Sequence, residues 1–162
     1  MLSLTVIGAG LTPAHEEGSH RDRPRCRQAP HRRTSGVTTL SAVLVCVMLG
    51  ALAVFQTFLA FGAPLGRFAW GGQHRILPTS LRLGSAVSIV LYAFLAAVVL
   101  VRANLVTTGV SDGVVHTAAW IVVGYFFIGI GMNLASRSKS ERAVMSPTVA
   151  VLCGLSALVA AG

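Results

Sequence analysis

The sequence predicts an all-α, polytopic membrane protein: a transmembrane four-helix bundle with a disordered N-terminal tail. The prediction rests on four uncharged apolar stretches, namely Leu40–Phe61, Leu83–Val101, Val114–Ala135 and Val144–Ala161. Each stretch is long enough to cross a hydrocarbon core about 30 Å thick as a helix. Their unbroken apolar character excludes barrel strands, in which apolar and polar residues alternate. Composition agrees, because 54% of the 162 residues are hydrophobic and only 11% are charged.

Residues 1–36 differ in composition from the membrane domain, residues 37–162. The segment from Thr12 to Gly36 is rich in Arg, His and Pro and has no hydrophobic period, which is typical of disorder. We expect one of two explanations for this tail. Either the natural chain starts near Val37 and the tail is upstream sequence, or the tail is a real, disordered cytoplasmic segment.

The first connection, Gly62–Arg82, is rich in Gly and Pro but also contains Phe68 and Trp70. This mixture predicts a loop that lies at the headgroup interface or dips slightly into it, since Trp is favoured there. Pro78 followed by Thr79 and Ser80 then predicts the start of the second helix.

Two further helix starts have recognisable capping residues. Asp112 is placed to cap the third helix. Ser138, with Glu141 three residues later, fits a capping box at the start of the fourth helix.

The positive residues around the spans predict the orientation. The first and third connections lie on one side of the membrane and together carry Arg67, Arg75, Arg82, Arg137, Lys139 and Arg142. The opposite side has only Arg102, apart from the tail. The positive-inside bias therefore predicts that both ends of the membrane domain face outward. The arginines of the tail would cancel this asymmetry, so a real cytoplasmic tail would invert the topology.

Small residues at four-residue spacing permit close helix approach. The pairs are Gly84 with Ser88, Ala93 with Ala97, Gly131 with Ala135, and Ala157 with Ala161. They favour a compact bundle, and they leave a homo-oligomer or a membrane-protein partner open alongside the membrane lipids.

Several function classes find no support in the sequence. The spans contain no carboxylate, which argues against proton-coupled transport. His74 and His116 fall on opposite sides and cannot share a haem iron. No cysteine pair, metal cluster or catalytic constellation is present, so we predict no metal, no cofactor and no catalytic residue. The net charge of +8 comes from the tail and loops, so nucleic-acid binding is not expected.

The cytoplasmic side carries the strongest candidate site. Gln56 and Asn133 are intramembrane polar residues near this side and should face the bundle or loop and form hydrogen bonds there. The hypothesis is an anion site, most plausibly for a lipid phosphate headgroup, formed by Arg67, His74, Arg75, Arg82, Arg137 and Arg142. The alternative is that the charges only set topology while the two amides join helices.

The loop and the fourth-helix start resemble small four-span bacterial integral membrane proteins with a GAPxG…AWGG loop and an N..S.S..ER segment. The matching positions are Gly62, Ala63, Pro64, Gly66, Ala69, Trp70, Gly71, Gly72, Leu77, Pro78, Arg82, Asn133, Ser136, Ser138, Glu141, Arg142 and Pro147. The resemblance covers residues from about Val37 to the C-terminus and implies a fold and a membrane location. The group has no assigned activity, so the resemblance implies no reaction.

These observations lead to one main functional prediction and two alternatives. We predict a non-enzymatic component of the bacterial cell membrane whose cytoplasmic face binds anionic lipid or a protein partner. The first alternative is a small transporter or channel subunit, with a polar path drawn from Gln56, Ser88, Tyr92, Tyr125 and Asn133. The second is a membrane-embedded enzyme acting on lipid phosphates through His74, Arg75 and Glu141.

Overall fold

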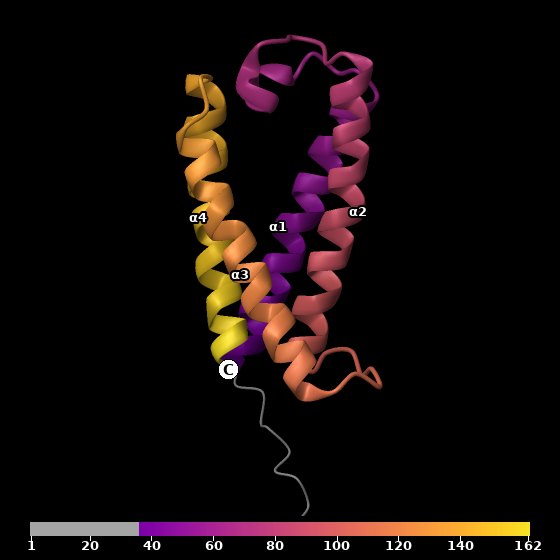
Figure 1. Cartoon of the computed structure of the whole chain (residues 1–162), viewed down its shortest axis with the longest axis vertical. Helices are drawn as coiled ribbons and strands as arrows, with labels where there is room; N and C mark the ends of the chain where they lie inside the picture. The colour runs from indigo at the N-terminus through magenta and orange to yellow at the C-terminus, as the bar shows by residue number, and fades with distance from the viewer. Residues whose placement is uncertain (1–35) are drawn as a thin grey trace, which may run out of the picture. The chain divides into compact units, whose positions relative to one another are not determined.

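The computed structural model describes residues 36–162, which form four long helices and two short 3-10 helices, with no strand in this range. The elements in chain order are α1 (Gly36–Ala60), η1 (Gly66–Phe68), η2 (Trp70–Gly72), α2 (Thr79–Arg102), α3 (Asp112–Leu134) and α4 (Lys139–Ala161) (Figure 1). All four long helices are long and apolar enough to cross a membrane, which confirms the predicted fold class. The predicted tail lies outside the described residues, apart from Gly36.

The helices alternate in direction, and neighbours in sequence pack as two hairpins, α1 with α2 and α3 with α4. Helix α1 also packs along α4, whereas α2 and α3 share fewer contacts. The start of α1 and the end of α4 meet at one end, where the Thr38 hydroxyl lies beside Gly162. The first and third connections therefore lie together at the other end (Figure 1).

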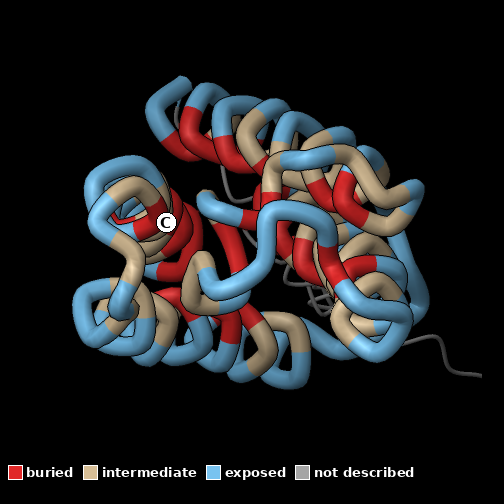
Figure 2. The backbone as a smooth tube through the Cα atoms, turned by 90° about the horizontal axis from the view of Figure 1, so that it is seen from above, coloured by how far each residue is buried: buried red, intermediate tan, exposed pale blue. Residues whose placement is uncertain are grey.

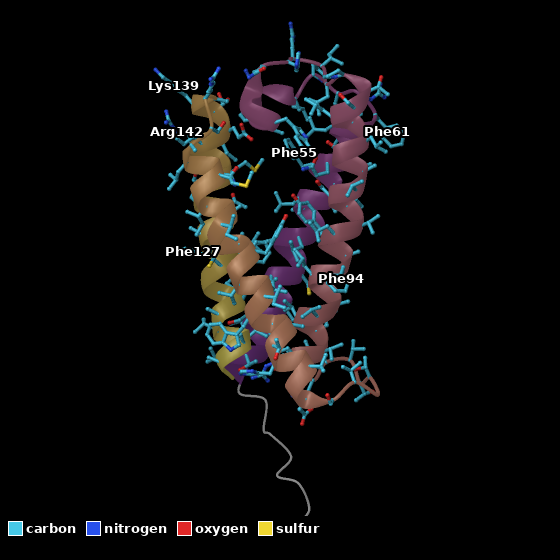
Figure 3. The ribbon with its side chains drawn as sticks, viewed as in Figure 1. Phe55, Phe61, Phe94, Phe127, Lys139 and Arg142 are labelled. Atoms are coloured by element: carbon cyan, nitrogen blue, oxygen red, sulfur yellow. The ribbon has the colours of Figure 1, made fainter. Side chains whose placement is uncertain are left out.

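Large apolar side chains point outward along the whole bundle. Phe94 is 63% exposed and Phe127 is 70% exposed, and both project away from the helices in Figure 3. Buried residues face the bundle interior instead (Figure 2). Helices that carry apolar side chains on every side suit a lipid environment. In water their outward apolar side chains would be exposed to solvent, which is unfavourable.

The main core fills the half of the bundle nearer the second connection. It consists of Ala42, Val45, Leu49, Leu95, Val99, Ala103, Val122, Phe126, Leu152 and Val159. At this end the buried Arg102 donates a hydrogen bond from its guanidinium to the carbonyl oxygen of Ala160, at 2.8 Å. A cation is well placed there, because the last carbonyls of a helix lack intrahelical partners and carry partial negative charge.

The helices start earlier than the uncharged stretches do. Helix α2 begins at Thr79 rather than Leu83, and α4 begins at Lys139 rather than Val144. Polar and charged residues occupy these first turns, as expected for the part of a membrane-spanning helix that meets water. Absence of charge therefore marks the lipid-buried part of each helix and not its full length.

One of the two capping predictions is confirmed and the other is wrong. Ser138 is the N-cap of α4 and its hydroxyl accepts a hydrogen bond from the Glu141 N–H at 3.2 Å, as predicted. The prediction for α3 was wrong, because Ser111 occupies the cap position and Asp112 is the first helical residue. Neither side chain caps that helix with a hydrogen bond.

The small-residue pairs contribute little to packing within one chain. Gly131 has open space where a Cβ would stand, and Ala93, Ala97 and Ala135 are exposed. Gly84 is different, because the ring of Trp70 packs directly against it. The other pairs remain available to contact lipid or a neighbouring protein.

Candidate functional site

The first connection folds back over the end of the bundle instead of lying flat at its edge. Gly66 makes this possible, since a Cβ there would collide with the carbonyl oxygen of His74 and with the side chain of Leu77. The buried side chains of Leu59, Ala69 and Leu77 form a second, smaller core beneath the connection. This core holds the two 3-10 turns against the helix ends.

Trp70 anchors the connection to α2. Its indole N–H donates a hydrogen bond to the fully buried hydroxyl of Ser85, at 3.2 Å. A Cβ on Gly84 would lie 2.6 Å from the indole ring, so only glycine allows this approach. The backbone of Trp70 has a positive φ of 55°, a left-handed conformation that residues other than glycine seldom adopt. The hydrogen bond and ring packing hold it in that conformation.

Glu141 joins the connection to α4. Its carboxylate oxygen Oε2 accepts a hydrogen bond from the Gly71 N–H at 2.9 Å and another from the Ser136 hydroxyl at 2.5 Å. The side chain is only 8% exposed. A capping box would direct this carboxylate back to the N–H of Ser138, but that N–H donates to the Ser136 hydroxyl instead.

A second link runs in parallel. The Ser138 hydroxyl donates a hydrogen bond to the carbonyl oxygen of Arg67 at 2.6 Å. Gly72 packs directly on Ser138, and a Cβ at Gly72 would lie 2.5 Å from the Ser138 Cβ. We call the interacting residues Arg67, Gly71, Ser136, Ser138 and Glu141 the polar junction. It holds the α1–α2 hairpin to the α3–α4 hairpin at this end.

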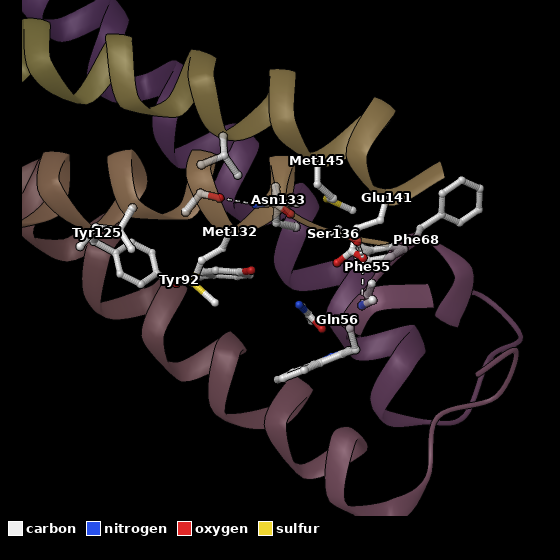
Figure 4. A pocket seen from close by; sticks show the side chains of 17 residues that line it. Phe55, Gln56, Phe68, Tyr92, Tyr125, Met132, Asn133, Ser136, Glu141 and Met145 are labelled. Atoms are coloured by element: carbon white, nitrogen blue, oxygen red, sulfur yellow. Dashed lines mark hydrogen bonds between the residues drawn. The ribbon is translucent and has the colours of Figure 1, made fainter. Parts of the chain in front are cut away.

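Beneath the polar junction lies a chamber of about 510 Å³, enclosed by all four long helices and the first connection. Its polar lining residues are Gln56, Tyr92, Tyr125, Asn133, Ser136 and Glu141 (Figure 4). The rest of the lining is apolar or aromatic and includes Phe55, Phe68, Trp70, Met132 and Met145. This volume lies within the range of small-molecule sites, which combine an apolar lining with a few polar groups.

The two intramembrane amides both line the chamber, as expected for residues that avoid lipid. Asn133 donates a hydrogen bond to the carbonyl oxygen of Gly129 in its own helix, at 2.8 Å. Gln56 is 9% exposed, and its buried Oε1 atom has no hydrogen-bond partner within the described residues. The hydrogen bond expected for Gln56 inside the bundle is therefore not present at its Oε1 atom within the described residues.

The chamber opens to the side of the bundle that would face lipid. Its lining residues on α3 include Tyr125, Ile128 and Met132, which are all exposed, Met132 to 72%. The opening lies along α3, beside the weakly packed boundary between α2 and α3.

The residues predicted to bind an anion lie outside the chamber. His74, Arg75, Arg137 and Arg142 are exposed around the polar junction, and the Arg67 guanidinium lies 4.6 Å from the centre of the Phe68 ring. Arg82 is half-buried, and its Nε–H donates to the carbonyl oxygen of Ala60 at 2.6 Å. We call the six residues, with Lys139, the basic face.

The residues predicted for a polar path and those predicted for an enzyme differ in how the structure places them. Four of the five residues proposed for a polar path line the chamber, and the exception is Ser88, whose hydroxyl bonds to the carbonyl of Gly84. The residues proposed for an enzyme do not form a unit, because no hydrogen bond or ion pair within residues 36–162 joins Glu141 to His74 or Arg75.

Sequence reasoning missed the chamber and the role of Trp70. One signal was available, since Gln56 and Asn133 were recognised as polar residues at similar depth. The placement of Glu141 could not be predicted from its spacing to Ser138, because that spacing predicted a capping box. No protein-family model, curated protein or solved structure matches this chain.

Proposed function

We propose that this integral membrane protein is a non-enzymatic binding protein that takes a lipid-soluble, amphipathic small molecule into the chamber. The observation that carries the proposal is the Gln56 side chain, which is buried, lines the chamber and has no partner for Oε1. An unsatisfied buried amide oxygen costs about 1–3 kcal/mol. A ligand that donates a hydrogen bond to Gln56, with the amide turned so that Oε1 faces the cavity, would remove that cost.

The lateral opening supports a ligand that arrives from the bilayer. The exposed chamber residues on α3 are apolar or aromatic, so they suit an apolar chain passing between α2 and α3. Gln56 and Glu141 are buried, and Glu141 belongs to the polar junction. An amphipathic molecule would therefore bind with its polar end toward Gln56 and Glu141 and its apolar end toward the opening. We further propose that the basic face is cytoplasmic and that the membrane is the cell membrane.

The test is mass spectrometry of small molecules that co-purify with the protein in a mild detergent. Met145→Trp would narrow the chamber, while Phe94→Trp adds bulk on the exposed surface of α2. We expect the wild-type protein and Phe94→Trp to retain an amphipathic molecule that Met145→Trp loses. Equal retention by all three proteins would contradict the proposal.

A second candidate function is contact between the basic face and anionic lipid headgroups. One observation favours it: Glu141, the only carboxylate at this end of residues 36–162, is turned inward to Gly71 and Ser136. The exposed positive charges are therefore not neutralised locally by Glu141. Such a surface attracts anionic lipid, with about 1 kcal/mol for each basic residue near the membrane.

A further inference from the structure

We propose that the ligand of the chamber is a single-chain amphiphile with an amine or ammonium headgroup, and that Glu141 is its counter-ion. This inference rests on the proposed function and narrows it to one chemical class. It combines an uncompensated carboxylate, an unsatisfied amide and an aromatic lining, which meet in one cavity.

The charge of Glu141 is not paired by a cationic side chain within residues 36–162. Lys139 and Arg142, its nearest basic neighbours in sequence, are exposed on the surface of α4. A buried carboxylate normally has a cationic partner or several hydrogen bonds, because desolvation of a charge costs several kcal/mol. The Gly71 N–H, the Ser136 hydroxyl and the N-terminus of α4 meet part of this need. A cationic ligand would supply the missing partner.

The hydrogen bonds leave one side of the carboxylate available. Gly71 and Ser136 both donate to Oε2, and Oε1 of Glu141 has no hydrogen bond within the described part of the chain. Because Glu141 lines the chamber, an N–H group in the chamber can reach this carboxylate. If Glu141 served only to link α4 to Gly71, its Oε2 atom would be sufficient. That role would not account for the unsatisfied Oε1 atom of Gln56.

The remaining lining suits an organic cation with an apolar chain. Trp70, Tyr92 and Tyr125 line the chamber, and aromatic rings attract organic cations. The Gln56 amide also lines the chamber, and its Oε1, which is itself buried, becomes an acceptor for a second N–H of the same headgroup when the amide turns toward the cavity. The volume of about 510 Å³ accommodates one alkyl chain, whereas a two-chain phospholipid would extend out of the chamber. An anionic headgroup would meet repulsion from Glu141.

The experiment uses the full chain in nanodiscs of zwitterionic phosphatidylcholine. Two photoreactive probes share one diazirine-bearing dodecyl chain and differ only in an amine or an alcohol headgroup. Cross-linked residues are located by peptide mass spectrometry. We expect both probes to label the chamber at Met145, with the amine at least about tenfold tighter, as for one charge-assisted hydrogen bond.

The matched variant is Glu141→Gln, which retains an acceptor for the Gly71 N–H. We expect it to remove the preference for the amine while labelling by the alcohol persists, which also reports an intact chamber. Competition by unlabelled dodecanoate should be weaker than competition by dodecylamine in the wild-type protein. Displacement of the amine probe by phosphatidylethanolamine would overturn the single-chain assignment.

The outcomes separate the two proposals. Equal affinity of the wild-type chamber for amine and alcohol would overturn the cationic ligand and leave the proposed function standing. Absence of chamber labelling by either probe would overturn both. The comparison of the amine probe with the alcohol probe in the wild-type protein tests the inference even if Glu141→Gln fails to fold.

Discussion

The backbone N–H of Gly71 donates a hydrogen bond to the carboxylate of Glu141 at 2.9 Å, joining residues 70 positions apart. This bond connects the loop after α1 to the first turn of α4. It closes one end of the chamber and places a carboxylate on the chamber wall. The same residue therefore contributes to the fold and to the proposed site.

The close contact between Gly72 and Ser138 predicts a severe effect of Gly72→Ala. Gly72 has a φ of 67°, and its new Cβ would lie 2.5 Å from the Ser138 Cβ. Left-handed backbone strain and overpacking together should lower the free energy of unfolding by about 2–4 kcal/mol. Denaturant unfolding in detergent micelles measures this. Gly124→Ala, at an open helical position, is the control and should not destabilise the protein.

Ser138 should matter more than its neighbour Ser140. The Ser138 hydroxyl both caps α4 and donates to the carbonyl of Arg67, whereas no hydrogen bond of the Ser140 hydroxyl is present in the described residues. Loss of an N-cap costs about 0.5–2 kcal/mol, so Ser138→Ala should lower the thermal midpoint clearly. Thermal unfolding of the matched variant Ser140→Ala should stay near the wild type. Equal midpoints for the two variants would refute the role given to Ser138.

Trp70→Phe tests the anchor on α2. The substitution removes the indole N–H and leaves the fully buried Ser85 hydroxyl without that partner. Loss of a partner for a buried polar group costs about 1–3 kcal/mol. Trp120→Phe is the control, because Trp120 is exposed and bonds only to His116, one turn before it. Circular dichroism during thermal unfolding should therefore distinguish the two variants.

The basic face predicts a defined lipid dependence. Replacement of the exposed Arg75 and Arg142 by Gln should reduce retention of anionic lipid during purification. Because these contacts are electrostatic, raising the salt concentration should weaken retention by the wild type in the same direction. Lipid mass spectrometry at two salt concentrations measures both effects. Unchanged retention in the double variant would exclude this function for Arg75 and Arg142.

The helices could be predicted from the sequence because lipid imposes a simple rule. A segment that crosses the bilayer must be apolar and must satisfy its own backbone hydrogen bonds. Leu83–Val101 and Val144–Ala161 meet that rule, and the corresponding helices are present in the structure. Their first turns were missed because Thr79 and Lys139 begin helices that continue beyond the apolar region.

The chamber could be predicted only in part, because it depends on contacts between distant segments. The polarity of Gln56 and Asn133 indicated that both face inward. Nothing in local sequence indicated that Trp70 would take a positive φ and pack on Gly84. For Glu141 the spacing from Ser138 predicted a local cap, but tertiary hydrogen bonds from Gly71 and Ser136 took its carboxylate.

The central claim, that an amphiphile from the bilayer binds in the chamber, can be tested most directly through Trp70. This residue lines the chamber, and Trp120→Phe leaves it as the only tryptophan in the chain. Fluorescence is measured in nanodiscs during titration with dodecanol brominated at its chain end, since bromine quenches indole on contact. The converse variant, Trp70→Phe, reports the exposed Trp120 instead. We predict quenching of Trp70 that saturates and is reversed by unbrominated dodecanol, while quenching of Trp120 rises without saturation. Quenching of Trp70 that neither saturates nor reverses would contradict binding in the chamber.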